Sequence, residues 1–414
     1  MDTLINTLKY DLFTSLKHKN FRYFMSGQCI SLLGTWTQRT AQAWLVYSIT
    51  KSPFLLGLIG AFQFGPQMLF SLFAGVIVDR FPKRKLLIFT QIVFMIQSLL
   101  LAVLVLSGTV KYWHIIILAL VFGFGQTLDL PARQAFSVEL VGKEDLMNAI
   151  SMNSTIVNLA KIIGPSLAGI IMLKLGVATC FFINSISFLP VIYGLYKITA
   201  NTCSSNKVHG NMLTEIKEGI LYVLNNDSLK FTCIIMLIVC TFSANAEVII
   251  PVFTTGSLHG SAKEYSFLLS ALGIGAFIAA LFMAGRSKKG PKNYILIGGA
   301  IFVSIAQILT YFLKQYYILT LLIILIGFFY LTFLNMSNST LQINSSNEFR
   351  GRVMSVYSLL NVGTTPIGNC FSGAVMEFLG DNSGFFICGL VTLIFTMALL
   401  IWRKIYISQL KEIN

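Results

Sequence analysis

Three charged residues stand inside long apolar runs of the sequence, where a charge is expensive. Arg39, Lys161 and Glu247 each lie well away from the ends of their runs. A charge at the centre of a membrane helix costs about 2.5–3.5 kcal/mol on insertion scales, so such residues usually face the bundle interior and mark a pathway. Arg39 and Lys161 are predicted to attract an anionic group. A carboxylate removed from water takes up a proton more readily, so Glu247 is the predicted proton-coupling residue.

Uncharged amide side chains accompany these charges in the same apolar runs and complete a predicted polar cavity. The predicted cavity residues are Arg39, Gln42, Gln63, Gln67, Lys161, Asn245, Asn335 and Asn338. Two alternatives stay open. The basic pair could reach the membrane interface or brace neighbouring helices, and Glu247 could be paired permanently with a basic residue.

Composition shows which elements must carry these residues. Of 414 residues, 55% are hydrophobic and 11% are charged, whereas soluble domains average about 45–50% apolar and about 25% charged. The apolar stretches are continuous, which excludes a disordered chain and the alternating strands of a membrane β-barrel. A spanning helix needs about 20 apolar residues. Twelve such spans are predicted at 21–49, 54–78, 86–107, 112–132, 148–173, 177–198, 230–256, 265–285, 293–313, 317–340, 353–379 and 383–402.

The basic residues predict how these spans are oriented. With the N-terminus inside, 23 of the 30 Lys and Arg residues fall in inner segments, five fall in outer loops and two lie inside spans. Cytoplasmic loops collect Lys and Arg, so both termini and the central connector are predicted to be cytoplasmic. The net charge of +14 is explained in the same way, without a nucleic-acid partner.

The chain is predicted to consist of two helical halves joined by a polar connector. The expected limits are a cytoplasmic amphipathic segment over 1–20, a six-helix bundle over 21–198, a connector with an amphipathic helix over 199–227, a second bundle over 228–403 and a tail over 404–414. Sliding one half over the other aligns Gly164 with Gly368 and Gly169 with Gly373. Two repeated six-span halves are a known transporter architecture.

Several classes of chemistry find no support in the sequence. The seven cysteines are scattered, with no spacing typical of a disulfide framework or a metal site. No GxxxxGK[ST] loop occurs, so ATP is not expected to act directly. We therefore expect no metal, no cofactor and no enzymatic activity, because an integral-membrane enzyme would need a cluster of reactive groups.

The segment 75–85, GVIVDRFPKRK, closes the second span and opens the third. It resembles the signature loop of the major facilitator superfamily, with a Gly, an Asp and a basic cluster, although Pro82 replaces the usual Gly. Further similar segments are 20–28, 34–36, 43–47, 129–136 and 350–355. Together they resemble the branch that contains the bacterial enterobactin exporter and the macrolide-efflux proteins. The resemblance implies an all-α membrane fold of twelve helices in two pseudo-symmetric halves.

The resemblance also implies a conformational latch on the cytoplasmic side. In the family the loop carboxylate meets the start of the eleventh span, here near Arg352, and the loop arginines could pair with an acidic residue of the fourth span. The predicted latch residues are Gly75, Asp79, Arg80, Arg84 and Asp129. The alternative is a loop that merely follows the bias of basic residues to the inner side. Gly285 stands where a second latch would need a carboxylate.

Proline and glycine predict helix kinks in two spans. The fifth span contains Gly164, Pro165 and Gly169, and the eleventh contains Pro366. Proline removes a helical hydrogen bond, and glycine lets helices approach closely. The fifth-span motif resembles one associated with exporters of the superfamily, although packing alone would explain it equally well.

These features favour a secondary-active transporter working by alternating access in a bacterial cytoplasmic membrane. The expected activity is proton-coupled export of an amphipathic small molecule such as a siderophore or a drug, by a monomer in the lipid bilayer. Import by symport and lipid flipping remain alternatives.

Overall fold

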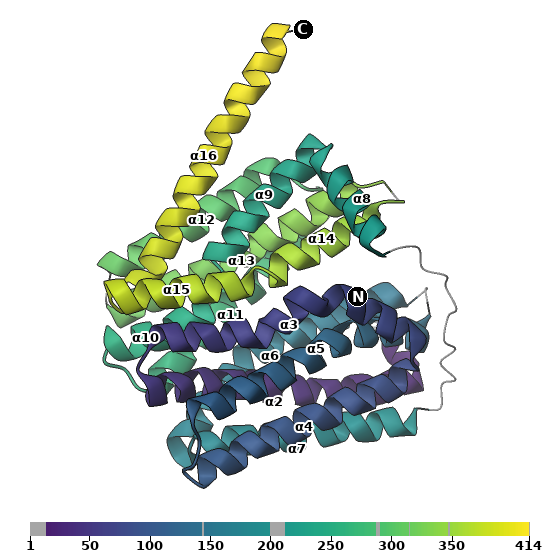
Figure 1. Cartoon of the computed structure of the whole chain (residues 1–414), viewed down its shortest axis with the longest axis vertical. Helices are drawn as coiled ribbons and strands as arrows, with labels where there is room; N and C mark the ends of the chain where they lie inside the picture. Colours follow the sequence, from purple (N-terminus) through teal and green to yellow (C-terminus); the bar gives the residue numbers. More distant parts are fainter. Residues whose placement is uncertain are drawn as a thin grey trace, which may run out of the picture. The chain divides into compact units, whose positions relative to one another are not determined.

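The computed structural model describes residues 14–142, 145–198, 212–286, 290–313, 315–346 and 348–413 (Figure 1). For Leu72, Val76, Asp79 and residues 212–216 and 404–413 it describes the backbone alone. All regular secondary structure of these described ranges is helical. The fold is therefore an all-α membrane fold, as predicted.

The first half of the chain contains a short 3₁₀ helix and six long helices. They are η1 (Thr14–Lys17), α2 (Lys19–Thr50), α3 (Pro53–Arg80), α4 (Lys83–Leu106), α5 (Tyr112–Val141), α6 (Leu146–Leu175) and α7 (Val177–Lys197). Their limits follow the first six predicted spans, except that α5 continues to Val141, whereas the fourth span is predicted to end at 132.

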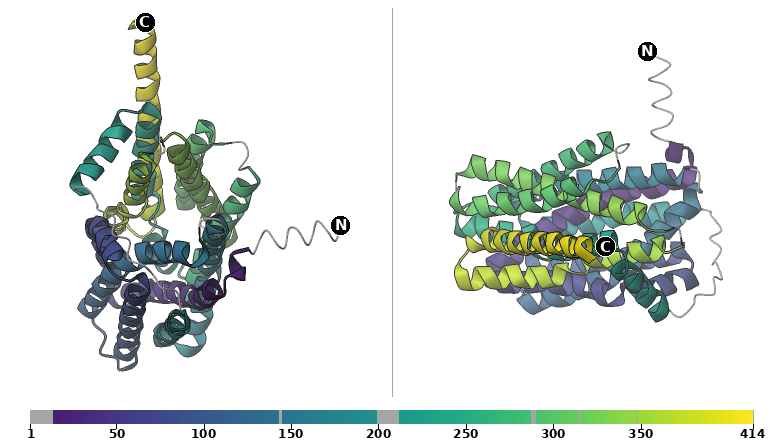
Figure 2. Two further views of the ribbon diagram at one scale, coloured as in Figure 1. Left: turned by 90° about the vertical axis from the view of Figure 1, so that its right-hand side faces the viewer. Right: turned by 90° about the horizontal axis from the view of Figure 1, so that it is seen from above.

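The second half begins with a short helix and contains two interrupted spans. Its helices are α8 (Met212–Leu224), α9 (Asp227–Phe242), α10 (Ala246–Gly256), α11 (Ala262–Gly285), α12 (Asn293–Phe312), α13 (Tyr316–Ile343), α14 (Arg350–Val362), α15 (Thr365–Leu379) and α16 (Ser383–Ile413). Helix α16 continues to Ile413 without a break (Figure 2).

Ten helical stretches of the described chain are long and apolar enough to cross a membrane, with α9 and α10 counted as one. Helix α2 and the α14–α15 pair complete the twelve predicted spans. The seventh and eleventh spans are each predicted as one helix, the eleventh with a kink at Pro366, and the structure shows each as two helices. The seventh breaks between Phe242 and Ala246, and the eleventh breaks at Gly363 and Thr364. Pro366 lies in the first turn of α15, where its missing N–H leaves no hydrogen bond unmade.

The chain divides by its internal contacts into two compact units. Unit 1 comprises residues 1–45 and 65–208, and unit 2 comprises 46–64 and 209–414. The first half of α3 thus groups with unit 2, and the change falls next to Pro66, inside that helix. The predicted limits assign all of 21–198 to the first bundle, so the two divisions differ at 46–64.

The structure describes only part of the two predicted amphipathic segments. Residues 1–13 and 199–211 lie outside the described chain. Beyond the first of these gaps, Ser15 donates from its hydroxyl to Asn148 Oδ1 at 2.6 Å, and His18 Nε2 lies 2.8 Å from Asp145 Oδ2. The hydrogen bond from His18 lowers the pKa of Asp145. These contacts attach η1 to the start of α6.

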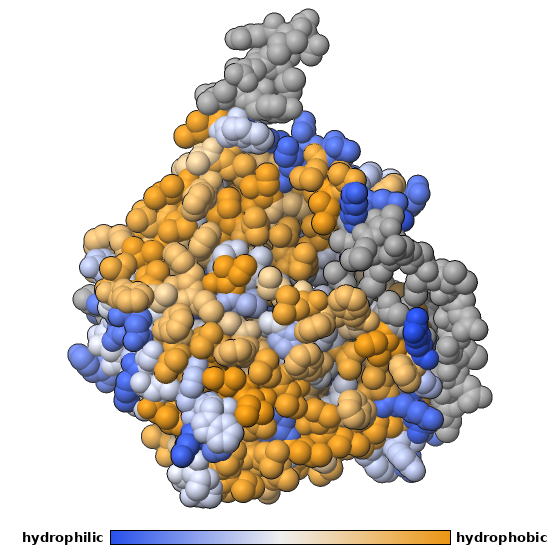
Figure 3. Space-filling view, in the orientation of Figure 1, coloured by the Kyte–Doolittle hydropathy of each residue, from blue (hydrophilic) through white to orange (hydrophobic). Residues whose placement is uncertain are grey.

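Large apolar side chains cover much of the molecular surface. Figure 3 shows residues of high hydropathy over much of the face in view. Exposed large apolar side chains of the chain include Leu173, Leu281 and Phe395, which are 64%, 59% and 51% exposed. Such a surface suits contact with lipid acyl chains. Inside the units, glycines bring helices together: a Cβ on Gly275 of α11 would come 1.9 Å from Ile324 O of α13.

Candidate functional site

The structure places both predicted cavity cations beside one aromatic ring. Arg39 and Trp36 lie one turn apart on α2, and Lys161 lies on α6. Arg39 Cζ is 4.9 Å from the centroid of the Trp36 ring, and Lys161 Nζ is 5.5 Å from it. All three side chains are half-buried. A cation over an indole face is attracted by the ring quadrupole, by about 2 kcal/mol or more when water is excluded. The three residues form what we call the Trp36 cluster.

The fifth-span glycine explains how α6 comes so close to this ring. A Cβ at Gly164 would lie 2.5 Å from Trp36 Cβ and 3.2 Å from the Thr37 amide nitrogen. The Thr37 hydroxyl donates to Gly164 O at 3.2 Å and lies 2.8 Å from Leu33 O in its own helix. Pro165 and Gly169 are buried along the same helix, which runs unbroken from Leu146 to Leu175. The predicted kink stays a prediction, whereas the close helix approach is observed.

The remaining predicted cavity amides are dispersed over both units. Gln42 is buried on α2, whereas Gln63 and Gln67 are half-buried on α3, on either side of the boundary between the units. Asn335 and Asn338 are half-buried on α13. Asn338 accepts a hydrogen bond from Gln342 and interacts with the hydroxyl of Tyr357 on α14. Sequence reasoning missed Tyr357, because its contact with α13 depends on how the two helices pack.

Asn245 lies at the break between α9 and α10 and is 1% exposed. Its side-chain nitrogen donates to Thr241 O at 2.9 Å and Phe242 O at 3.2 Å. The last carbonyls of a helix have no partner within the helix, so this amide supplies one. A Cβ on Gly368 of α15 would lie 2.1 Å from Thr241 O, which shows that the second interrupted span passes close to this break.

Glu247 lies in the first turn of α10, a setting that the sequence did not predict. It is half-buried, and the buried Tyr265 of α11 is within range of its charge. The N-terminal end of a helix favours a negative charge by about 0.3–1 kcal/mol, and by up to about 2 when partly buried. The break in the seventh span therefore places this carboxylate at a helix N-terminus rather than in the middle of a continuous helix.

Arg84 and Asp129, which could pair in the predicted latch, each bind other groups in this structure. Arg84 lies in the first turn of α4, and its guanidinium donates to Leu195 O at 2.6 Å and Tyr196 O at 2.8 Å, at the end of α7. Carbonyls at a helix C-terminus carry partial negative charge and attract a cation. Of the other latch residues, Arg80 is exposed at the end of α3, Gly75 is half-buried, and the side chain of Asp79 lies outside the described structure.

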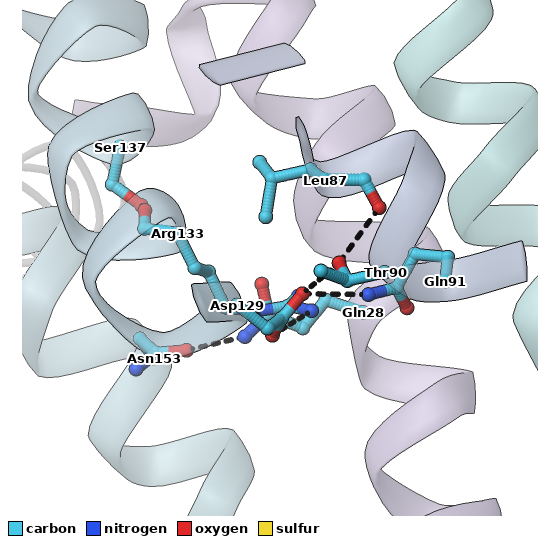
Figure 4. Close-up of polar contacts among 8 residues, drawn as sticks. All are labelled: Gln28, Leu87, Thr90, Gln91, Asp129, Arg133, Ser137 and Asn153. Atoms are coloured by element: carbon cyan, nitrogen blue, oxygen red, sulfur yellow. Dashed lines mark hydrogen bonds and ion pairs between the residues drawn. The ribbon is translucent and has the colours of Figure 1, made fainter. Parts of the chain in front are cut away.

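Asp129 instead binds four polar groups inside unit 1 (Figure 4). Its Oδ1 accepts from Thr90 Oγ1 at 2.7 Å and Gln91 Nε2 at 2.8 Å, and its Oδ2 accepts from Arg133 Nε at 2.9 Å and Arg133 Nη2 at 2.8 Å. Asp129 is 4% exposed. A buried carboxylate needs such partners to offset its desolvation. Asp129 therefore stabilises the packing of α4 against α5.

The start of the eleventh span, the expected partner of Asp79, contacts α8 within unit 2. Arg352 Nη1 lies 2.6 Å from Glu218 Oε2. The Ser346 amide donates to the Tyr222 hydroxyl at 3.1 Å, and the Tyr222 ring stacks on Phe349 with centroids 4.4 Å apart. Helix α8 is thus attached to the first turn of α14, while a contact of Asp79 with this region stays a prediction.

Comparison with known proteins gives the family of the chain. Residues 11–412 match the family model described as transmembrane secretion effector. The staphyloferrin A transporter of Staphylococcus aureus (strain NCTC 8325 / PS 47) is 26% identical over 402 residues, which cover 95% of this chain and 98% of that protein. The multidrug efflux pump Tap of Mycolicibacterium fortuitum is 23% identical over 380 residues, covering 90% and 91%.

Solved structures show the same fold at low sequence identity. The crystal structure of the nucleoside transporter NupG superposes with a TM-score of 0.74 at 11% identity and covers 92% of this chain and 98% of NupG. The twelve spans, the division into two units and the family match over nearly the whole length agree. The chain therefore belongs to the transmembrane secretion effector family of the major facilitator superfamily and is a multi-pass membrane transporter.

Proposed function

We propose that this transporter exports an anionic, amphipathic small molecule such as a siderophore from the bacterial cytoplasm, by alternating access and in exchange for protons. The single observation that carries the proposal is the Trp36 cluster, which holds two cations beside one aromatic ring. Such a surface complements a solute that combines negative charge with apolar area. The similarity to a staphyloferrin A transporter supports a siderophore as the substrate.

The proton is proposed to bind Glu247. The carboxylate is half-buried in the first turn of α10, inside the seventh span. Alternating access would expose it first to one side of the membrane and then to the other, so that it could bind a proton on one side and release it on the other.

Transport into inside-out membrane vesicles tests the direction and the driving force. With an acidic vesicle lumen, staphyloferrin A is expected to accumulate inside the vesicles, and a protonophore should abolish the accumulation. Ethidium, a permanent cation, serves as the comparison because the similarity to Tap leaves drug export as the alternative. Uptake confined to right-side-out vesicles would establish import instead. Accumulation of ethidium alone would establish drug export.

The latch remains part of the proposal and has a separate test. Asp79→Asn is expected to shift the protein toward the inward-open state if Asp79 holds the start of α14. Cysteines placed near each membrane face and labelled from either side report that shift. Unchanged labelling would remove the latch and leave residues 79–85 as a basic loop set by the charge asymmetry of the membrane.

A further inference from the structure

We infer that the contact between the first half of α3 and the end of α15 is an outer gate, which closes when Asp381 binds a proton from outside the cell. The inference rests on alternating access, which is part of the proposed function, and adds an acid-sensitive group besides Glu247. Residues 46–64 group by their contacts with unit 2, although they belong to helices of the first half. The distribution of basic residues predicts that the turn before α3 and the loop after α15 both lie on the outer side.

Glycines allow the first half of α3 to pack directly on α15. A Cβ on Gly373 of α15 would lie 2.6 Å from Pro53 O. A Cβ on Gly57 or Gly60 of α3 would overlap with Asn369, which is 4% exposed. Small residues of this kind let two helix backbones approach closely. Because α3 continues into unit 1, opening of the outer side would separate these two helices.

A carboxylate of α15 ties the start of α3 to this contact. The Ser52 hydroxyl donates to Glu377 Oε2 at 2.8 Å, and the Phe54 amide donates to the same oxygen at 3.3 Å. The first amides of a helix have no partner within the helix, and a negative charge near them is favourable. Glu377 therefore stabilises the closed contact as a carboxylate, and it also places a negative charge beside the loop that follows α15.

Asp381 lies in that loop, where its own charge opposes the closed contact. Its side chain is half-buried and meets the end of α10, since a Cβ on Gly256 would overlap with Asp381 Oδ2. Burial, and secondly the charge of Glu377, raise the pKa of Asp381. The closed contact therefore binds the proton more tightly than an open form in which this carboxylate is in water. Acid on the outer side favours closure, and a rising pH opposes it.

The other titratable groups around this contact can be named. Tyr47 of α2 is within range of the charges of both carboxylates, and its hydroxyl forms a hydrogen bond with Thr255 of α10. Lys51, in the turn before α3, and His259, after the end of α10, are both exposed. Histidine is the side chain that ordinarily titrates near neutral pH, so His259 needs a control of its own.

The direction of the effect suits an exporter. Once the substrate has left on the outer side, a proton on Asp381 would let the outer side close, and the transporter could then open to the cytoplasm. A more acidic exterior would therefore favour the return of the empty transporter.

The experiment measures how readily the contact opens at different outer pH. Asn369→Cys in an otherwise cysteine-free protein is labelled with a membrane-impermeant maleimide, added outside right-side-out vesicles of fixed internal pH. Its labelling rate is divided by that of Lys263→Cys, an exposed position, because thiols react faster as the pH rises. We expect this ratio to fall about threefold or more from about pH 8 to about pH 5, since each unit by which closure raises a pKa changes the equilibrium about tenfold.

Three further variants identify the group that binds the proton. Asp381→Asn should abolish the pH dependence and keep the ratio low at every pH, because the amide resembles the protonated acid. Glu377→Gln should move the midpoint to lower pH, because a negative charge beside Asp381 is lost. His259→Gln is the matched control and should keep the profile of the unsubstituted gate. Melting temperatures of each preparation show whether it remains folded.

The outcomes distinguish the inference from the proposed function. Folded Asp381→Asn protein that keeps the full pH dependence overturns the inference, as does a loss of that dependence in His259→Gln. If the transporter carries staphyloferrin A but labelling of Asn369→Cys does not depend on pH, the inference fails and the proposed function stands. If labelling depends on pH through Asp381 but neither staphyloferrin A nor ethidium is transported, the gate stands and the proposed function fails.

Discussion

The two units each contain a buried glutamine that links three helices, and the two glutamines are used differently. In unit 1, Gln38 of α2 donates to Gln97 Oε1 of α4 at 3.1 Å and accepts from Asn184 Nδ2 of α7 at 2.7 Å and from the Ser98 hydroxyl. In unit 2, Gln307 of α12 accepts from the Ser243 hydroxyl at 3.0 Å and donates to Ser243 O at 3.1 Å. Ser243 also lies 3.0 Å from Thr392 of α16.

The difference between these two networks matches the difference between the two helices that carry the charges. Gln38 binds side chains only, and α2 runs unbroken past it to Arg39. Gln307 binds a backbone carbonyl where α9 ends, and Glu247 follows in the first turn of α10. A continuous helix thus presents cations that an aromatic ring stabilises, and an interrupted helix presents a carboxylate that a helix N-terminus stabilises. A buried glutamine thus binds beside a continuous helix that presents cations in unit 1, and beside a helix break that precedes a carboxylate in unit 2.

Replacing Gln38 should have the largest effect, because three side-chain partners lose their hydrogen bonds. Interhelical hydrogen bonds in membranes average about 0.6 kcal/mol each, so Gln38→Leu is expected to destabilise the protein by about 2 kcal/mol. Unfolding in detergent, followed by circular dichroism, measures the change. Gln42→Leu on the same helix is the comparison. A loss below that of Gln307→Leu would contradict the ranking of the two networks.

Gln307→Leu should have a smaller effect on stability and a more local effect on the backbone. Two hydrogen bonds are lost, which corresponds to about 1 kcal/mol. The Ser243 carbonyl then has no amide donor from α12, so amide hydrogen exchange should rise around the break between α9 and α10. Exchange in α2 should stay unchanged. Unchanged exchange around the break in the Gln307→Leu variant would show that Gln307 does not support the break.

Glu247→Gln should change stability about as much as Gln307→Leu does, and it should change transport most. Loss of a carboxylate from the first turn of a partly buried helix is worth about 1 kcal/mol. Under the proposed mechanism, gradient-driven uptake into vesicles should stop, whereas exchange without a gradient should continue. Glu264→Gln, which removes the carboxylate of the capping box at Ser261, is the control. Uphill transport that survives with its pH dependence intact would exclude Glu247 as the proton carrier.

The smallest expected effect belongs to the connector helix. Glu218 and Arg352 are 46% and 28% exposed at their side chains, and exposed ion pairs contribute about 0.2–1 kcal/mol. Glu218→Gln should therefore leave the melting temperature nearly unchanged and make α8 more susceptible to proteolysis. Lys217→Gln at the neighbouring exposed position is the control. Equal cleavage in both variants would show that the ion pair does not hold α8 on α14.

Much of the architecture could be predicted from composition alone. Most limits of the first six spans, an irregularity at Pro366 in the eleventh span and the position of α8 follow from the apolar runs, that proline and the amphipathic pattern of 212–224. The break at Ser243–Asn245 could not be predicted, since no proline or glycine stands there. It depends on Asn245 capping α9 and on Gln307, which is distant in sequence, binding the carbonyl of Ser243.

The candidate site, too, could be predicted from the sequence only in part. Arg39, Lys161 and Glu247 could be chosen from the sequence because the membrane acts on each residue separately: a charge inside an apolar run is unfavourable whatever surrounds it. The contact of Trp36 with Lys161 could not be predicted, because it depends on Gly164 letting α6 approach. The partners of Arg84 and Asp129 could not be predicted either, because Arg84 binds carbonyls at the end of α7 and Asp129 binds Arg133.

The sequence by itself therefore determined which segments enter the membrane, which of their residues are charged and which family the motifs resemble. These properties depend on the local cost of placing a residue in an apolar solvent. Only the tertiary structure decided which groups bind one another: two cations at one indole, a carboxylate at a new helix start, and an arginine at the end of α7. Which side chains contact one another depends on how packed helices are rotated and how far apart they lie. A single side chain, such as the missing Cβ of Gly164, is enough to change that rotation and that separation.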